Sequence, residues 1–177
     1  MEIYLIRHTT PVLERGLIYG RKELLLHAGF PSELEIVRSK LDPDLDIIYS
    51  SPASRCTTLA KAIGAGFVTD SRLQELDFGE WEGKTWDTVD PAALQAWMDD
   101  YVHACTPGGE SMMQMYARVK SFWDDLGKTA HHKIAVVTHA GVIRLILSMV
   151  RGIALTEIFD INPAYGEVFR IERSISR

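Results

Sequence analysis

The sequence contains little cysteine. Cys56 and Cys105 are the two cysteines among 177 residues, and their spacing matches neither a disulfide framework nor a metal-binding pair. This count excludes the class of small secreted domains that are held together by several disulfides. We expect reduced thiols and a cytoplasmic protein.

Long apolar runs and basic runs are also missing. No apolar stretch approaches the ~20 residues of a transmembrane helix, and the apolar run after Met1 is too short for a signal peptide. The formal net charge is −5, which argues against nucleic acid or an anionic membrane as the main partner. It does not exclude a small anionic substrate, because a few arginines can form a local positive pocket.

Internal repeats and low-complexity segments are absent as well. A chain of 177 residues with 46% hydrophobic and 24% charged residues is typical of one globular domain with its own core. We expect a single domain over residues 1–177, with a cap segment around residues 84–110. The sequence leaves the oligomeric state open.

Strand-like and helix-like segments alternate along the chain. Runs rich in β-branched residues predict strands at residues 3–6, 46–50, 67–69, 133–138 and 167–173. Apolar residues at helical spacing predict helices at residues 30–41, 52–63, 91–101, 112–126 and 142–150. This alternation predicts an α/β fold, with three layers (α/β/α), a mostly parallel central sheet and a small helical cap insert.

Two of the expected helices begin at recognisable capping residues. Ser51 and Pro52 fit the N-cap and first helical positions of one helix. Ser111 and Gln114 have the spacing of a capping box at the start of another.

Basic side chains follow three of the predicted strands. Arg7 and His8 end the first strand, Arg55 comes shortly after the second, and His139 ends the strand at 133–138. Because the carboxyl ends of parallel strands meet at one edge of a sheet, these side chains are expected to converge. Two arginines and two histidines in one place predict a phosphate-binding site.

Two histidines in such a site indicate catalysis as well as binding. One imidazole can attack phosphorus and hold the phosphoryl group covalently, while the other stabilises charge on the phosphoryl oxygens. A carboxylic acid is then needed to protonate the leaving oxygen. Glu75 and Glu82 are both candidates for this acid, and physical reasoning alone does not choose between them.

Metal catalysis finds little support in the sequence. His131 and His132 are adjacent, so their side chains face different directions, and no carboxylate pattern completes a site. A solvated loop is the better interpretation. We therefore expect no metal site and no cofactor.

Five segments resemble the motifs of the histidine phosphatase superfamily, which has the phosphoglycerate mutase-like fold. They match RHG/RHT, SSPxxRAxxT, LxExxFGxWEG, PGGES and VTHGGxIR in the family's order, at residues 5–9, 50–57, 73–83, 107–111 and 137–144. Each motif alone is weak, but the set covers almost the whole chain.

The resemblance implies a role for each matching residue. His8 corresponds to the nucleophile that becomes phosphohistidine, and Arg7, Arg55 and His139 correspond to the rest of the phosphate pocket. Glu75 corresponds to the usual proton donor. Glu82 would then pack or cap rather than transfer a proton.

Within the superfamily, residues 7–20 resemble the α-ribazole phosphatase branch, which removes the 5′-phosphate of α-ribazole phosphate in cobalamin nucleotide-loop assembly. The branch pattern is near RHTxPxxxxGxCYGxxDxPL. When it is aligned from Arg7, Ile18, Glu23 and Leu25 stand where the pattern has Cys, Asp and Pro. The resemblance implies a metal-independent phosphatase whose partner is a small phosphorylated metabolite.

Other functions remain as alternatives. One is a broad-specificity sugar-phosphate or phosphoglycerate phosphatase or mutase. The resemblance implies that a mutase has a long basic insert, which holds a second anionic group of the substrate. Residues 86–107 instead hold four Asp residues and a single cation candidate, His103. Another is a pseudophosphatase that binds phosphate without turnover, which nothing in the sequence favours.

Overall fold

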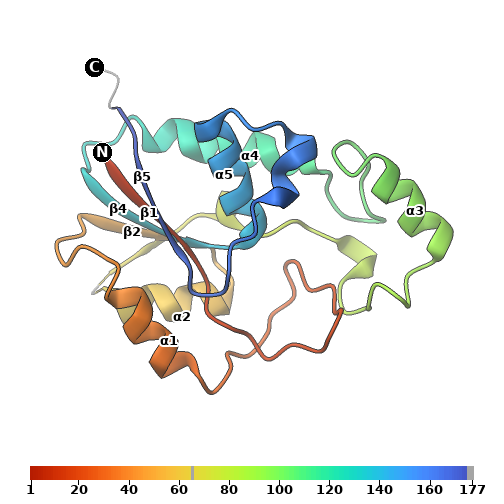
Figure 1. The fold of residues 1–177 in the computed structure, drawn as a ribbon, viewed down its shortest axis with the longest axis horizontal. Coiled ribbons are helices and arrows are strands. Elements are labelled where there is room, and N and C mark those ends of the chain that lie inside the picture. Colours follow the sequence, from red (N-terminus) through yellow and green to blue (C-terminus); the bar gives the residue numbers. More distant parts are fainter. Residues whose placement is uncertain (65, 175–177) are drawn as a thin grey trace.

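A five-stranded sheet forms the centre of the computed structural model, which describes residues 1–64 and 66–174 (Figure 1). The spatial order of its strands is β3-β2-β4-β1-β5. Their bounds are Glu2–Arg7 for β1, Ile47–Ser50 for β2, Val68–Thr69 for β3, Lys133–Thr138 for β4 and Val168–Glu172 for β5.

Four of these strands are parallel, and β5 runs antiparallel to β1 at one edge. In the register of β1 with β4, Arg7 lies opposite Thr138, so the residues that follow each strand emerge side by side. Both strands are buried along most of their length because helices cover the two faces of the sheet.

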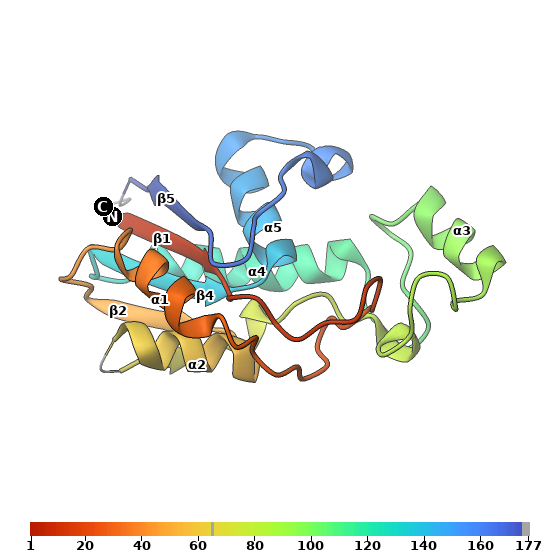
Figure 2. The same ribbon diagram turned by 60° about the horizontal axis from the view of Figure 1, so that its bottom comes forward.

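Two pairs of helices form the outer layers (Figure 2). Helices α1 (Phe30–Arg38) and α2 (Ser54–Ile63) pack with one core cluster on one face. Helices α4 (Met112–Leu126) and α5 (Ala140–Arg151) pack with the other. The predicted three-layer α/β/α fold with a mostly parallel sheet is therefore confirmed.

Helix α3 (Pro91–Asp99) lies apart from the sheet, beyond the carboxyl ends of its strands (Figure 2). It contains no buried residue and packs against a small hydrophobic cluster through Ala93, Leu94 and Trp97. Three short 3₁₀ helices lie in the loops: η1 (Ser71–Leu73), η2 (Gly79–Trp81) and η3 (Leu155–Asp160). In the part of the chain that the structure describes, no helix has the length and apolar composition needed to cross a membrane.

Helix boundaries agree with the sequence only in part. Ser111 and Gln114 form the predicted capping box at the start of α4. The predicted start of α2 at Ser51 is wrong, because the helix begins at Ser54 with Ala53 as N-cap. Helix α1 was expected to reach residue 41 but ends at Arg38, where the chain continues as turns.

Candidate active site

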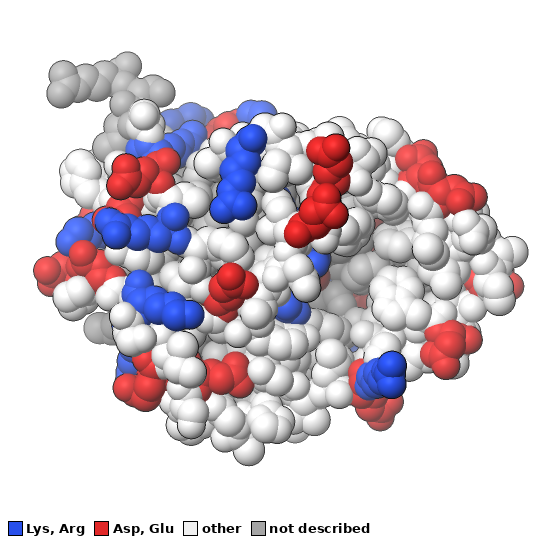
Figure 3. All heavy atoms as spheres, viewed as in Figure 1, with Lys and Arg blue, Asp and Glu red and all other residues white. Residues whose placement is uncertain are grey.

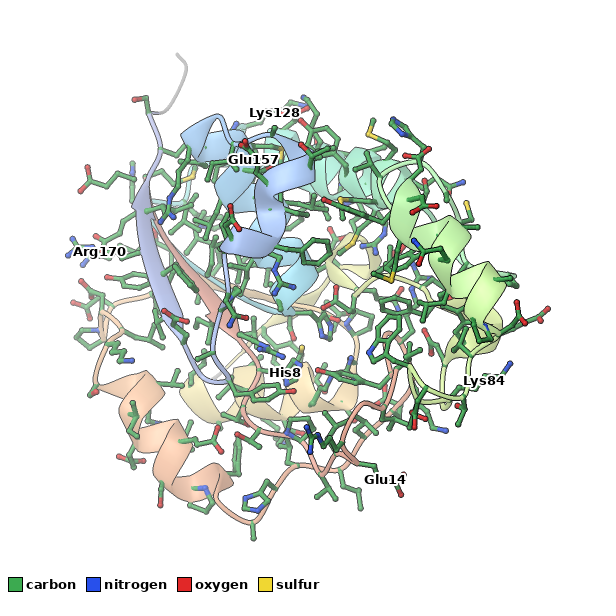
Figure 4. The ribbon with its side chains drawn as sticks, turned by 45° about the vertical axis from the view of Figure 1, so that its right-hand side comes forward. His8, Glu14, Lys84, Lys128, Glu157 and Arg170 are labelled. Carbon is green, nitrogen blue, oxygen red and sulfur yellow. The ribbon has the colours of Figure 1, made fainter. Side chains whose placement is uncertain are left out.

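The ends of β1, β2 and β4 lie next to one another at one edge of the sheet. The backbone N–H of His8 donates to the carbonyl of Thr138 (3.0 Å), and that of Ser51 donates to Val137 (2.9 Å). His8 therefore lies in the interior at the end of β1, whereas the other labelled side chains of Figure 4 lie at the periphery. The rings of His8 and His139 approach with centroids 5.3 Å apart.

His8 is held as a neutral imidazole with a lone pair on one ring nitrogen. Its Nδ1–H donates to the carbonyl of Thr9 (2.8 Å), which leaves the lone pair on Nε2. The ring is only 1% exposed. Burial, followed by the positive charge of Arg55, lowers the pKa of His8 to about 3. At neutral pH the nucleophilic form is the one present.

His139 lies between Arg55 and Ser51. Its Nδ1 accepts from Arg55 Nη2 (3.3 Å), so Nε2 carries the proton and donates to Ser51 Oγ (2.8 Å). Burial, together with the neighbouring His8 and Arg55, holds the pKa of His139 well below its usual value. Ser51 thus orients this imidazole instead of capping α2, which explains why the predicted helix start is wrong.

Arg55 is fully buried near the start of α2, and backbone carbonyls fix its guanidinium. Nη2 donates to Gly20 (2.7 Å) and Nη1 donates to Lys22 (2.9 Å). Gly20 has φ +36°, and a Cβ there would lie 2.5 Å from the carbonyl oxygen of Leu76. Glycine therefore allows this loop to come close enough to orient the arginine.

Arg7 is held by two tyrosines and a carbonyl that the sequence reasoning missed. Its Nη1 donates to the carbonyl of Pro163 (2.7 Å), and its Cζ lies 3.7 Å from the ring centroid of Tyr165. Its Nη2 is 3.5 Å from the hydroxyl of Tyr19. No local motif at residues 163–165 predicts this contact.

Several buried polar atoms of this site lack a hydrogen-bond partner. Within residues 1–64 and 66–174, the buried side-chain atoms without a partner are Arg7 Nε, Thr9 Oγ1, Arg55 Nε and Trp97 Nε1. Three of these four belong to the site. Unpaired buried donors are costly unless a ligand accepts from them, so this cluster fits an oxygen-rich anion such as phosphate.

Glu75 lies at the same edge, beside the start of α5. Its Oε2 accepts from the backbone N–H of Gly141 (3.1 Å). A Cβ at residue 141 would lie 2.2 Å from Glu75 Oε1, so the carboxyl group depends on glycine for this approach. The other candidate acid, Glu82, accepts from the backbone N–H groups of Arg21 (2.9 Å) and Phe78 (3.2 Å). Glu75 also accepts from the backbone N–H of Leu76 (3.0 Å). The two carboxyl groups differ in that Glu75 lines the cavities of the site, whereas Glu82 caps a turn.

Two arginines hold the backbone of Glu75. Arg118 Nη2 and Arg21 Nε donate to its carbonyl oxygen, at 3.0 and 3.4 Å. Glu110 forms ion pairs with both arginines. Glu110 belongs to the PGGES motif at residues 107–111, whereas sequence reasoning missed Arg21 and Arg118, which lie far from Glu75 along the chain.

Two cavities meet at Glu75, and the face drawn in Figure 3 is hollowed near its middle, where Lys or Arg atoms are visible. The smaller, of about 220 Å³, is polar and is lined by Arg55, His139 and Glu75 among others. The larger, of about 290 Å³, is mostly apolar. Its lining includes Arg7, Tyr19, Glu75, Phe78, Trp86, Trp97, Arg144 and Phe159.

His8 lines neither cavity. Its ring lies 5.5 Å from that of Tyr165, which also covers Arg7. Among the described residues, no group of three or more His, Cys, Asp or Glu side chains is arranged to hold a metal ion.

Known proteins share this fold. The crystal structure of an α-ribazole phosphatase from Shigella flexneri superimposes with a TM-score of 0.90 at 23% identity, over 98% of this chain and 91% of that one. At this identity the likeness shows the fold alone.

Relatives are also found by sequence. A "Putative phosphoserine phosphatase 2" from Hydrogenobacter thermophilus is 32% identical over 169 residues, covering 90% of this chain and 83% of that protein. "Phosphoglycerate mutase-like protein 4" from Arabidopsis thaliana is 29% identical, covering 85% and 71%. Residues 3–176 match the family described as "Histidine phosphatase superfamily (branch 1)". The chain therefore belongs to branch 1 of the histidine phosphatase superfamily.

Proposed function

We propose that this chain is a phosphomonoesterase that acts through a phosphohistidine on His8, and that its substrate in the cytoplasm is α-ribazole 5′-phosphate. The observation that carries the chemistry is the pair of neutral, buried imidazoles beside two oriented guanidinium groups. Glu75 completes the site as the nearby carboxylic acid. The roles of all five residues are part of this proposal.

In the first step, His8 Nε2 attacks phosphorus while the bond from phosphorus to the ester oxygen breaks. The departing oxygen takes the proton of Glu75. Arg7 and Arg55 donate to the phosphoryl oxygens, where charge changes most in the transition state. His139 joins them when its Nε2–H exchanges the hydrogen bond with Ser51 for one with a phosphoryl oxygen.

In the second step, water attacks the phosphohistidine. Glu75, now a carboxylate, accepts a proton from that water, and the bond between phosphorus and Nε2 breaks. Inorganic phosphate leaves, and His8 and Glu75 return to their starting forms. No step requires a metal ion.

The apolar cavity supports the choice of substrate. Phe78, Trp86, Trp97 and Phe159 line it, and aromatic walls suit a planar aromatic leaving group such as the benzimidazole of α-ribazole. Two of these residues belong to the segment at 84–110, which we propose to be a cap over the leaving group. The name of the Shigella flexneri structure supports the same substrate.

A broader phosphatase for small phosphorylated acids is the second candidate. It is favoured by the name of the Hydrogenobacter thermophilus relative, which is 32% identical to this chain. A serine side chain would fill little of the apolar cavity, so we rank this candidate below the first.

Phosphate release from a panel of monoesters tests both candidates. The panel holds α-ribazole 5′-phosphate, phosphoserine, 3-phosphoglycerate and p-nitrophenyl phosphate, each assayed with and without a chelator. We expect the highest kcat/KM for α-ribazole 5′-phosphate and full activity with the chelator. A preference for phosphoserine would favour the second candidate, and loss of activity that a divalent ion restores would contradict the metal-free mechanism. The absence of phosphate release from every ester would indicate a pseudophosphatase.

A further inference from the structure

Arg144 is a motif residue that the proposed mechanism does not use. It lies on α5, one turn after Gly141, and lines the apolar cavity. Its Nε donates to the carbonyl of Ile161 (2.7 Å), and its Cζ lies 5.2 Å from the ring centroid of Phe159. The guanidinium is therefore oriented from two sides before any ligand arrives.

The terminal nitrogens of Arg144 are available to a ligand. Within residues 1–64 and 66–174, neither Nη1 nor Nη2 has a hydrogen bond or an ion pair. The side chain is half-buried. Burial, followed by the charge of Arg7, lowers the pKa of Arg144, and Glu75 partly offsets this when it is ionised. A half-buried cation with unused donors is stabilised by a ligand that brings acceptor oxygens.

The position of Arg144 falls between the two ends of the site. Glu75 and Arg7 line the same cavity as Arg144 on the catalytic side, and Phe159 is its neighbour on the aromatic side. In an aromatic riboside 5′-phosphate, the sugar lies between the phosphate and the base. With phosphate at His8 and the base among the aromatic side chains, the sugar would lie beside Arg144.

We propose that Arg144 is a specificity-determining residue whose terminal nitrogens donate to the hydroxyl oxygens of a pentose that links the scissile phosphate to an aromatic base. This proposal rests on the proposed function and adds a sugar subsite to it. It also distinguishes this site from one for small phosphorylated acids, in which Arg144 would face a carboxylate.

The experiment compares ribosides with their 2′,3′-dideoxy analogues. One pair is α-ribazole 5′-phosphate and its dideoxy analogue, and the other is adenosine 5′-phosphate and its dideoxy analogue. Phosphoserine and p-nitrophenyl phosphate, which lack a sugar, complete the set. The enzymes are the wild type, Arg144→Gln, Arg144→Lys, and Arg151→Gln as a matched control on the exposed end of the same helix.

The wild type and the Arg151→Gln control are expected to favour each riboside over its dideoxy analogue by about 10-fold or more in kcat/KM, since a hydrogen bond to a charged group is lost. Arg144→Gln is expected to bring this ratio close to one and to lower kcat/KM for p-nitrophenyl phosphate far less. Arg144→Lys, which keeps the charge but not the fork, is expected to retain only part of the ratio.

Three results would overturn the proposal. The first is a wild type that does not distinguish ribosides from dideoxy analogues, a measurement that needs no variant to fold. The second is an equal loss on all substrates in Arg144→Gln, which would indicate a structural role. The third is a selective loss on phosphoserine, which would indicate a carboxylate subsite. The adenosine pair tests the sugar subsite even if α-ribazole 5′-phosphate is not preferred, and no hydrolysis of either riboside would contradict it.

Discussion

The proposed phosphate end and the proposed leaving-group end of the site are built in different ways. His8, Arg55 and His139 follow strands of the sheet and are at most 1% exposed. The aromatic residues of the larger cavity come from loops, 3₁₀ helices and α3, and Trp86 and Phe159 are 37% and 51% exposed. At the first end, His8 and His139 directly follow strands and loop carbonyls orient the two arginines. The second end is formed by short segments with few buried residues.

This difference predicts that the two ends of the site have different functions. Reactive groups need a fixed geometry and a low dielectric, which strand ends inside a packed sheet provide. A surface built from loops can change its shape without disturbing the sheet. We therefore expect substitutions at the phosphate end to affect all substrates and those at the aromatic end to affect only some.

The largest expected effect comes from removing the proposed nucleophile. His8→Ala deletes the covalent route, so we expect kcat to fall roughly 10⁴-fold or more for every ester. His132→Ala, at an exposed position, is the matched control and should behave as the wild type. Steady-state phosphate release measures both, and near-normal turnover in His8→Ala would refute the assignment of His8.

Substitutions of the two candidate acids, Glu75 and Glu82, test which of them protonates the leaving group. Glu75→Gln cannot donate a proton, so hydrolysis of alkyl phosphates should fall roughly 10²-fold or more. Hydrolysis of p-nitrophenyl phosphate should fall much less, because its leaving group needs little protonation. Glu82→Gln should reduce both esters alike, if at all. If Glu82→Gln showed the dependence on leaving group instead, the acid would have to be reassigned.

The buried imidazoles predict how stability depends on pH. Their pKa values are lowered in the folded state, to about 3 for His8, so between pH ~6.5 and 5 the unfolded chain binds protons that the folded chain does not. The free energy of unfolding should therefore fall with decreasing pH, by up to ~1.4 kcal/mol per pH unit for each histidine.

Urea unfolding at several pH values measures this slope. His8→Asn should remove the part of the slope that belongs to His8, and His132→Asn, at an exposed position, should not change it. A flat dependence between pH 6.5 and 5 would show that the two imidazoles are not held neutral by burial.

The smallest expected effect lies at the aromatic end. Trp86→Ala removes one wall of the apolar cavity, so kcat/KM for an aromatic riboside phosphate should fall about 3- to 10-fold. The kcat for p-nitrophenyl phosphate should change less. Met98→Ala, at an exposed position of α3, controls for general damage to the segment. A uniform loss in Trp86→Ala would mean that the two ends are not independent.

The sequence predicted those parts of the molecule that depend on local pattern. Apolar runs mark β1 and β4, and the rule that parallel strands end at one edge predicts that His8 and His139 lie close together. The capping box at Ser111 was also readable, because its two partners are three residues apart.

The remaining features depend on contacts between distant segments. Tyr165 covers Arg7, although the two residues are 158 positions apart in the sequence. No local spacing could predict this contact. Ser51 carried a correct local signal for a helix start, but its hydroxyl bonds to His139 instead. In that case a tertiary hydrogen bond prevailed over a local preference.

The most direct test of the account is to find the phosphorylated residue. The enzyme is mixed with p-nitrophenyl phosphate, quenched in alkali within milliseconds, and digested for mass spectrometry. We expect a phosphoryl group on His8 and none in His8→Ala. A phosphoryl group on another side chain, or a burst of p-nitrophenol without phosphorylated His8, would contradict it.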